Sequence, residues 1–340
     1  MNIIDLHEDR SDNALCTTHK DFFATNHTDW WNAEKMDALN QVDLKRLQKS
    51  KVSAVIGAIF IDPDAMITTK NDTLCYPIDA ASFELWRHLK YYDWVIEKSA
   101  WAIYQILSGL DLSAEVMASW KIGLLKHLEG FYFAHPLDKN FDILDDVYAK
   151  WVRSVAMTWW TSSNMAGGND KNERGLNDMW KRFIEKLASK KMLIDLAHAS
   201  QKSFEDIMQI VKKPVMVSHT KITDRRDKAR FLTVDQAKKV ADGGGIIGIM
   251  TMKSEDDQFS LVDLESYVKH IKQAMIIAWE DHVAMWTDFD GLTKEHSIEG
   301  FIDIWKVDLL IIEMKKQNLS DAQIEKFLGN NALRFIQENI

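Results

Sequence analysis

Residues 192–220, MLIDLAHASQKSFEDIMQIVKKPVMVSHT, form one strand–helix–strand pattern. A short apolar run at each end of this stretch flanks the amphipathic segment 202–212. Short apolar strands that alternate with amphipathic helices are typical of parallel sheets, in which each helix crosses over to the next strand. Each apolar run ends in a histidine, His198 or His219, and the 21 positions between them match one β/α repeat.

The same alternation extends over most of the 340 residues and predicts eight β/α units, the size of a (β/α)₈ barrel. A doubly wound open sheet is the competing architecture, but no Gly-rich phosphate loop follows the first apolar run. The pattern predicts strands at 2–7, 51–60, 122–129, 153–158, 192–198, 215–219, 245–250 and 282–287, and helices at 41–49, 80–109, 142–151, 175–189, 202–212, 233–241, 261–279, 301–316 and 320–338.

Composition excludes several classes of protein. The chain is 46% hydrophobic with a net charge of −9, so we expect no nucleic-acid partner. The N-terminus lacks the basic and apolar regions of a secretory signal, and no apolar run is long enough to cross a bilayer. The two cysteines, Cys16 and Cys75, lie far apart in the sequence, which fits a reducing compartment. We therefore expect a cytoplasmic protein without a membrane partner.

No repeat or linker divides the chain, which contains only 4 prolines. We expect one domain over 1–340, ending in an amphipathic helix over 318–340 that is not a hydrophobic tail.

Chemically reactive residues gather where predicted strands end. The first strand closes on His7, Glu8 and Asp9. Residues two apart on an extended backbone face the same side, so His7 and Asp9 can contact one cation. In a barrel, His198 and His219 point into the same mouth as this pair.

Three carboxylates complete the candidate set. Glu129 ends the third predicted strand, where it is either a ligand that bridges two metal ions or a surface residue before a turn glycine. Asp288 and Asp290 follow the last strand in TDFDG, a sequence that also suits a tight turn. Imidazole and carboxylate ligands suit Zn²⁺, or Mn²⁺, Co²⁺ or Fe²⁺, and two such ions hold a hydroxide between them. The set predicts metal-assisted hydrolysis.

These motifs also resemble those of the membrane (renal) dipeptidase family of metallopeptidases, in the same order and over nearly the whole chain. The similarity implies a (β/α)₈ barrel of the metal-dependent amidohydrolase type with a binuclear zinc centre. The motifs are IIDLHEDR, QVDLKRL followed by VIGAIF, HLEG, MLIDLAHAS, PVMVSHT, KARFLTVDQ, GGGIIGI, TDFDG and KFLGNNALRF.

The resemblance assigns a role to each zinc ligand. It implies that His7 and Asp9 bind one zinc, that His198 and His219 bind the other, and that Glu129 bridges the two ions.

The resemblance also assigns the residues that act on the substrate. Asp288 matches the acid/base that takes a proton from the bridging hydroxide and delivers it to the leaving amine. Arg230 matches the residue that binds the C-terminal carboxylate of the substrate, and Arg226 is the alternative if the register is shifted. The resemblance implies a homodimer as well.

Two departures from the family pattern affect the rim of the site. Trp159 stands where mammalian members have a histidine that stabilises the oxyanion, and its indole can only donate a hydrogen bond. It is either a substrate contact or a packing residue. Arg10 follows the first motif, and the segment 10–40 that it begins is expected to be a rim loop or lid, or else dimer surface.

The sequence therefore predicts a zinc-dependent dipeptidase whose partner is a small peptide, with L,L- and L,D-dipeptides as candidate substrates. One alternative is another barrel metallohydrolase, such as an amidase, an N-acyl amino-acid deacylase or a lactonase. A second is a non-catalytic scaffold, which has no physical reason to keep so many ionisable ligands in one mouth.

Overall fold

The structure of the chain is a computed structural model, and the structural statements below concern the residues that it describes. These are residues 1–12, 14–15, 21–23, 41–60, 68–70, 73–75, 78–129, 141–156, 158–159, 166–169, 175–224, 230–254, 260–293 and 295–340.

Within these ranges, eight parallel strands form a nearly closed barrel, which confirms the fold class predicted from the sequence. Neighbouring strands pair in chain order. A parallel bridge between Glu8 and Phe289 and a 3.0 Å hydrogen bond from the amide of Asp9 to the carbonyl of Phe289 connect the last strand to the first. An open doubly wound sheet is thereby excluded. The strands are β1 (Ile3–Glu8), β2 (Val52–Phe60), β6 (Ile122–Glu129), β7 (Val152–Ala156), β8 (Leu193–Asp195), β9 (Met216–Thr220), β10 (Ile246–Ile249) and β11 (Val283–Met285).

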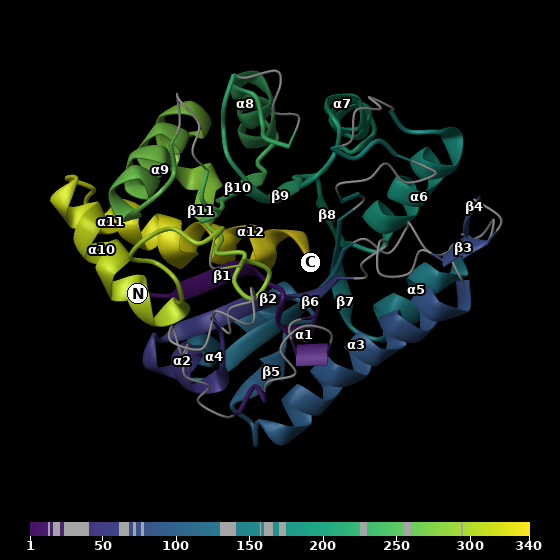
Figure 1. Ribbon diagram of the computed structural model, residues 1–340, viewed down its shortest axis with the longest axis horizontal. Coiled ribbons are helices and arrows are strands. Elements are labelled where there is room, and N and C mark those ends of the chain that lie inside the picture. The colour runs from purple at the N-terminus through teal and green to yellow at the C-terminus, as the bar shows by residue number, and fades with distance from the viewer. Residues whose placement is uncertain are drawn as a thin grey trace.

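Helices surround the strands, and α12 and the C-terminus lie near the middle of the view in Figure 1. None of the helices in the described ranges is long and apolar enough to span a bilayer. The helices are α1 (Arg10–Asp12), α2 (Leu44–Lys49), α3 (Ile78–Lys98), α4 (Ala114–Met117), α5 (Asp142–Ala149), α6 (Asp178–Ser189), α7 (Gln201–Ile210), α8 (Val234–Asp242), α9 (Leu264–Ala278), α10 (Val307–Lys316), α11 (Asp321–Glu325) and α12 (Asn331–Asn339), and β3 (Thr68–Lys70) pairs with β4 (Thr73–Cys75) outside the barrel.

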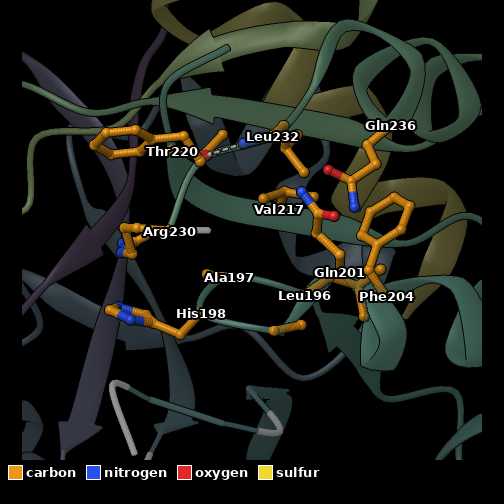
Figure 2. Close-up of a pocket in the computed structure, with 12 residues that line it drawn as sticks. Leu196, Ala197, His198, Gln201, Phe204, Val217, Thr220, Arg230, Leu232 and Gln236 are labelled. Atoms are coloured by element: carbon orange, nitrogen blue, oxygen red, sulfur yellow. Dashed lines mark hydrogen bonds between the residues drawn. The ribbon is translucent and has the colours of Figure 1, made fainter. Parts of the chain in front are cut away.

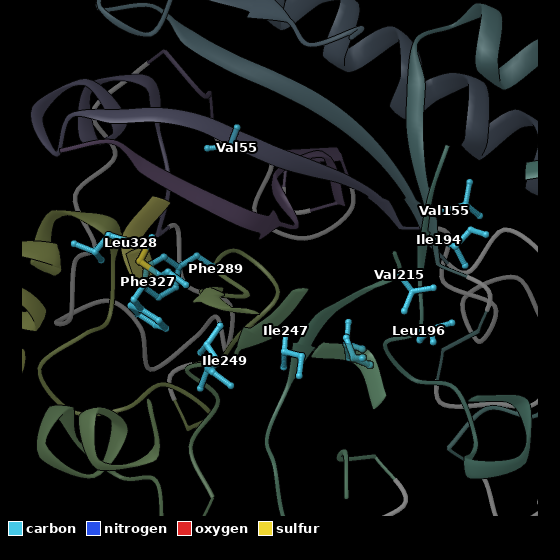
Figure 3. Packing of buried hydrophobic residues seen from close by; sticks show 14 of the residues in the cluster. Val55, Val155, Ile194, Leu196, Val215, Ile247, Ile249, Phe289, Phe327 and Leu328 are labelled. Carbon is cyan, nitrogen blue, oxygen red and sulfur yellow. The ribbon is translucent and has the colours of Figure 1, made fainter. Parts of the chain in front are cut away.

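The core has two layers because successive side chains on a strand point to opposite faces. One layer lies between the strands and the surrounding helices and includes Val55 and Ile247 (Figure 3). The other fills the barrel itself and includes Ile56, Leu125 and Trp286, against which α12 packs. The barrel is thus a packed core, and the space for a ligand lies beyond it, at the ends of the strands.

The prediction of one long helix over 80–109 is wrong in its second part. α3 ends at Lys98, and an extra strand, β5 (Ile103–Gln105), pairs in parallel with the start of β6. Ala100 and Trp101 lie between them with φ of 48° and 77°, which a right-handed helix does not allow.

Two further predicted segments are the C-terminal helix over 318–340 and the rim segment 10–40. The segment 318–340 is continuously helical from Asp321 to Asn339, with a π-helical segment (Lys326–Asn330) between α11 and α12. Most of 10–40 lies outside the described residues, so the rim loop or lid remains a prediction.

Candidate metal centre and active site

A cavity of about 310 Å³ lies at the carboxyl ends of the barrel strands. Eight of the site residues predicted from the sequence line it, although they come from segments spread over the whole chain, whereas the candidate Asp290 does not. These residues are His7, Asp9, Glu129, Trp159, His198, His219, Arg230 and Asp288, and the other described lining residues are Phe60, Met250, Met252, Gly291, Leu292 and His296.

β1 supplies one half of the candidate centre. The Nε2 atom of His7 lies 3.3 Å from Oδ1 of Asp9 and 3.5 Å from Oε2 of Glu129. Oδ1 of Asp288 is 3.9 Å from the same nitrogen. The imidazole stacks on the buried indole of Trp286, with 4.8 Å between ring centroids, so its plane is fixed from below. Three carboxylates thus converge on one edge of a held imidazole.

β8 and β9 supply the other half. Nε2 of His198 lies 2.8 Å from Nε2 of His219 and 3.6 Å from Oε1 of Glu129. The far nitrogen of each ring is engaged elsewhere: Nδ1 of His198 lies 2.9 Å from Oδ1 of Asn169, and Nδ1 of His219 lies 2.8 Å from Oγ of Ser218. Such partners orient imidazole ligands in metal sites. Glu129 lies between the two halves, with one oxygen toward each.

The donor atoms fit divalent cations. Within the described part of the chain, Oε1 of Glu129 is buried without a hydrogen-bond partner. Unpaired buried polar atoms are unfavourable, and imidazole nitrogens with carboxylate oxygens are ligands that zinc and similar metals accept. Three groups of potential ligand atoms each lie within 4.8 Å of one another: His7, His127 and Glu129; His7, His219 and Asp288; and Glu129, His198 and His219.

The electrostatics of the cavity favour a cation. Burial raises the pKa of Glu129 to about 8, and the carboxylate of Asp9 adds to this shift. Burial and then Asp9 raise the pKa of Asp288 to about 6. Burial lowers the pKa of His7, but the three surrounding carboxylates outweigh it and raise that pKa to about 10. The carboxylates therefore repel one another in the protein alone, and a bound cation relieves that repulsion.

Two residues of the cavity have an unusual backbone conformation. His198 follows β8 and Asp288 follows β11, and each has a φ of 61°. Left-handed backbone is unfavourable for residues other than glycine and persists where the surrounding structure holds it, which often occurs at functional sites. Ser200 caps α7 directly after this turn by accepting a hydrogen bond from the amide of Ser203. The sharp turn aims the imidazole of His198 into the mouth.

Arg230 brings a positive charge to the cavity beside His219. Its Nη1 atom donates a 3.0 Å hydrogen bond to the carbonyl of His219. Burial lowers its pKa to about 10, so the guanidinium is charged at neutral pH. In Figure 2, the side chains of Arg230 and His198 extend toward the same side, away from the Thr220–Leu232 hydrogen bond. The geometry suits a carboxylate that spans the metal centre and the guanidinium.

Trp159 is half-buried beside the histidines. Its ring centroid is 4.8 Å from that of Phe60 and 6.3 Å from that of His198. The two aromatic rings give the cavity an apolar wall next to the metal ligands. Arg226, the alternative to Arg230, lies outside the described residues.

Sequence reasoning missed several polar residues around the centre. His127 lies two residues before Glu129 on β6, and potential ligand atoms of the two side chains lie within 4.8 Å of each other. The alternation of side chains along a strand was the signal that pointed to His127. Ser218 was signalled only by its position beside His219. Asn169 lies outside any strand, and no sequence pattern connects it to His198.

Comparison with known proteins gives a consistent result. The model of the membrane dipeptidase family, peptidase family M19, matches residues 1–339. Dipeptidase verJ of Clonostachys rogersoniana is 25% identical over 315 residues, 89% of this chain and 79% of that protein. An uncharacterised Klebsiella pneumoniae protein from the pqqA 5′ region is 26% identical over 77% of this chain and 96% of its own length.

Solved structures share the fold at lower identity. A Rhodobacter sphaeroides metallopeptidase, crystallised with a phosphinate mimic of the dipeptide L-Ala-D-Ala, has a TM-score of 0.82 at 18% identity and covers 100% of this chain and 99% of its own. The probable dipeptidase PvdM of Pseudomonas aeruginosa has a TM-score of 0.80 at 17% identity and covers 100% and 96%.

Proposed function

The chain belongs to the membrane dipeptidase family, peptidase family M19, and is a metal-dependent dipeptidase; we propose that it cleaves dipeptides with a free C-terminal carboxylate and uses two zinc ions to do so. The observation that carries this proposal is the convergence of five imidazole and carboxylate ligands and one buried arginine on a single cavity of about 310 Å³. A cavity of this size can hold a small ligand such as a dipeptide.

The first step of the proposal is the metal assignment. His7 and Asp9 would hold one ion, His198 and His219 the other, and Glu129 would contact both. The support is geometric, because the two oxygens of Glu129 lie 3.5 Å and 3.6 Å from the ring nitrogens of His7 and His198. When bound, such ions polarise a carbonyl and lower the pKa of water, which is the chemistry that amide hydrolysis needs.

The second step concerns the proton. We assign Asp288 as the acid/base: it accepts a proton from the attacking water on one of its carboxylate oxygens and donates it to the nitrogen of the leaving amino acid. Its position supports this role, since the side chain lies at the cavity beside Asp9 and His7. Burial and the adjacent carboxylate keep its pKa closer to neutrality than that of an ordinary aspartate.

The third step is recognition of the substrate. Arg230 would bind the C-terminal carboxylate, for which its planar array of donors is suited. The hydrogen bond to the carbonyl of His219 holds the guanidinium beside the metal centre. Trp159 and Phe60 would contact an apolar side chain of the dipeptide. Both L,L- and L,D-dipeptides are proposed substrates.

A panel of peptides tests the proposal. Zinc-loaded protein is incubated with L,L- and L,D-dipeptides, each with a free and with an amidated C-terminus, and the released amino acids are measured with and without a chelator. We expect cleavage of free dipeptides only, lost on chelation. Equal cleavage of the amidated peptides would favour another barrel metallohydrolase, such as an amidase, and Trp159 in place of the family histidine is the observation that favours this second candidate.

Two properties predicted from the sequence also remain proposals, namely a homodimer and a cytoplasmic location. The wide separation of Cys16 and Cys75 in the sequence supports a reducing compartment. Light scattering during size-exclusion chromatography measures the molar mass and tests the dimer.

A further inference from the structure

The carboxylate of Asp290 gathers three distant segments of the chain. Its Oδ1 atom accepts hydrogen bonds from the amides of Gln41 at 2.6 Å and Val42 at 3.3 Å, and its Oδ2 atom accepts one from Nη1 of Arg10 at 3.2 Å. The amide of Asp290 donates to Oε1 of Gln41 at 2.9 Å in return. The carboxylate is fully buried. It therefore joins the start of α1, the residues before α2 and the loop after β11.

This carboxylate lies on the turn that carries Asp288. Asp288 and Asp290 have φ of 61° and 68°, and each such conformation is unfavourable by roughly 1–3 kcal/mol outside glycine. Before the turn, Thr287 is held by Asp5, which accepts hydrogen bonds from its amide at 3.1 Å and from its hydroxyl at 2.5 Å. After the turn, the hydrogen bonds that the Asp290 carboxylate accepts hold the backbone in the same way. Asp288 thus lies between two fixed points.

We propose that Asp290, together with Arg10 and Gln41, is a positioning residue that sets the orientation of the Asp288 carboxylate in the hydrolysis; this inference rests on the proposed function. Arg10 directly follows Asp9, so the Arg10–Asp290 ion pair fixes the distance between the two segments that carry Asp9 and Asp288. A buried ion pair contributes little to stability compared with apolar packing, which agrees with a role in geometry.

The experiment compares substitutions that weaken this network with one that breaks a partly exposed ion pair elsewhere. Asp290→Asn and Arg10→Leu remove the pair, and Arg10→Lys keeps its charge. The control is Asp93→Asn, which removes the partner of the buried Lys126 at 2.5 Å, far from the turn in the sequence and between α3 and β6. The readouts are kcat and KM for a dipeptide, zinc content, and hydrogen–deuterium exchange of the amides of 287–291.

We expect kcat to fall roughly ten- to hundredfold in Asp290→Asn and Arg10→Leu, because small displacements of a catalytic group have effects of this size. KM and zinc content should stay close to the wild-type values, exchange at the turn should be faster, and Arg10→Lys should recover most of kcat. Unchanged exchange and kcat in the first two variants, or an equal loss of kcat in Asp93→Asn, would overturn the proposal.

The exchange measurement separates this inference from the proposed function. If the wild-type protein cleaves no dipeptide, the proposed function fails, while faster exchange in Asp290→Asn still shows that the network holds the turn. Wild-type exchange in that variant overturns the positioning role whatever the substrate is.

Discussion

The Nε2 atoms of His198 and His219 lie 2.8 Å apart, although His198 follows β8, His219 lies in β9 and their Nδ1 atoms have separate partners. Burial lowers the pKa of both imidazoles well below the ordinary value, so two neutral rings face each other. Neutral imidazoles that converge in this way, beside the oxygen of Glu129, form a natural site for a cation.

The first prediction concerns this pair. His198→Ala removes one ligand of the second ion, so we expect zinc content to fall toward one ion per chain and dipeptide cleavage to be lost, with the far-UV circular dichroism unchanged. The control is His282→Ala, since His282 lies directly before β11, where its Nδ1 atom contacts the carbonyl of Gly245. Elemental analysis of both variants provides the measurement. A fully active His198→Ala protein would refute the site assignment.

A second prediction concerns Gly291, which packs directly against the carboxylate of Asp9. A methyl group at position 291 would overlap Oδ2 of Asp9. Gly291→Ala should therefore displace a metal ligand and weaken zinc binding by roughly tenfold or more, as changes next to metal ligands do. Gly243→Ala is the matched control, because a Cβ there meets its nearest neighbour at 3.4 Å. Competition with a chromophoric chelator measures both affinities, and equal affinities would contradict the prediction.

The third prediction tests the role of Arg230. Arg230→Ala should lower kcat/KM for free dipeptides by roughly ten- to hundredfold, the effect of losing a charge-assisted hydrogen bond of about 1.5–3 kcal/mol. C-terminally amidated peptides, which offer no carboxylate, should stay uncleaved by the wild type and by the variant. Arg334→Ala, on α12, is the control for a lost positive charge. A wild-type kcat/KM in Arg230→Ala, or an equal loss in Arg334→Ala, would contradict the assigned role of Arg230.

The fourth prediction concerns pH and a histidine far from the centre. Burial, and then the charge of Lys221, lower the pKa of His270 to about 4 from its usual 6.5. Between these values the unfolded chain binds a proton that the folded protein excludes, so the free energy of unfolding falls as the pH decreases. From pH 7 to pH 5 this group accounts for about 2 kcal/mol.

Urea unfolding at both pH values measures this effect. His270→Gln should show a smaller decrease in the free energy of unfolding than the wild type, by about that amount. Identical pH dependence in His270→Gln and wild type would contradict the assigned pKa shift.

Much of the site was predictable from the sequence because its residues lie at or near the ends of apolar runs. In a parallel barrel all strands end at one rim, so His7, Glu129 and His219 had to meet there once the fold class was known. The family resemblance added the roles of Arg230 and Asp288, which no spacing rule provides.

Other features depend on contacts between distant segments and could not be predicted. The break in the helix over 80–109 arises from the positive φ at Trp101, and a Trp carries no signal for left-handed backbone. Asn169 reaches His198 from a segment without regular structure. The pair of Arg10 and Asp290 joins residues 280 positions apart, which only the closed barrel brings together.

The central claim is tested most directly by a zinc titration of metal-free protein, with amino-acid release measured from an L,L-dipeptide and from its C-terminal amide. The account predicts that release from the free dipeptide rises with added zinc up to two ions per chain, while the amide stays intact. No release at two bound ions, or equal release from the amide, would contradict it.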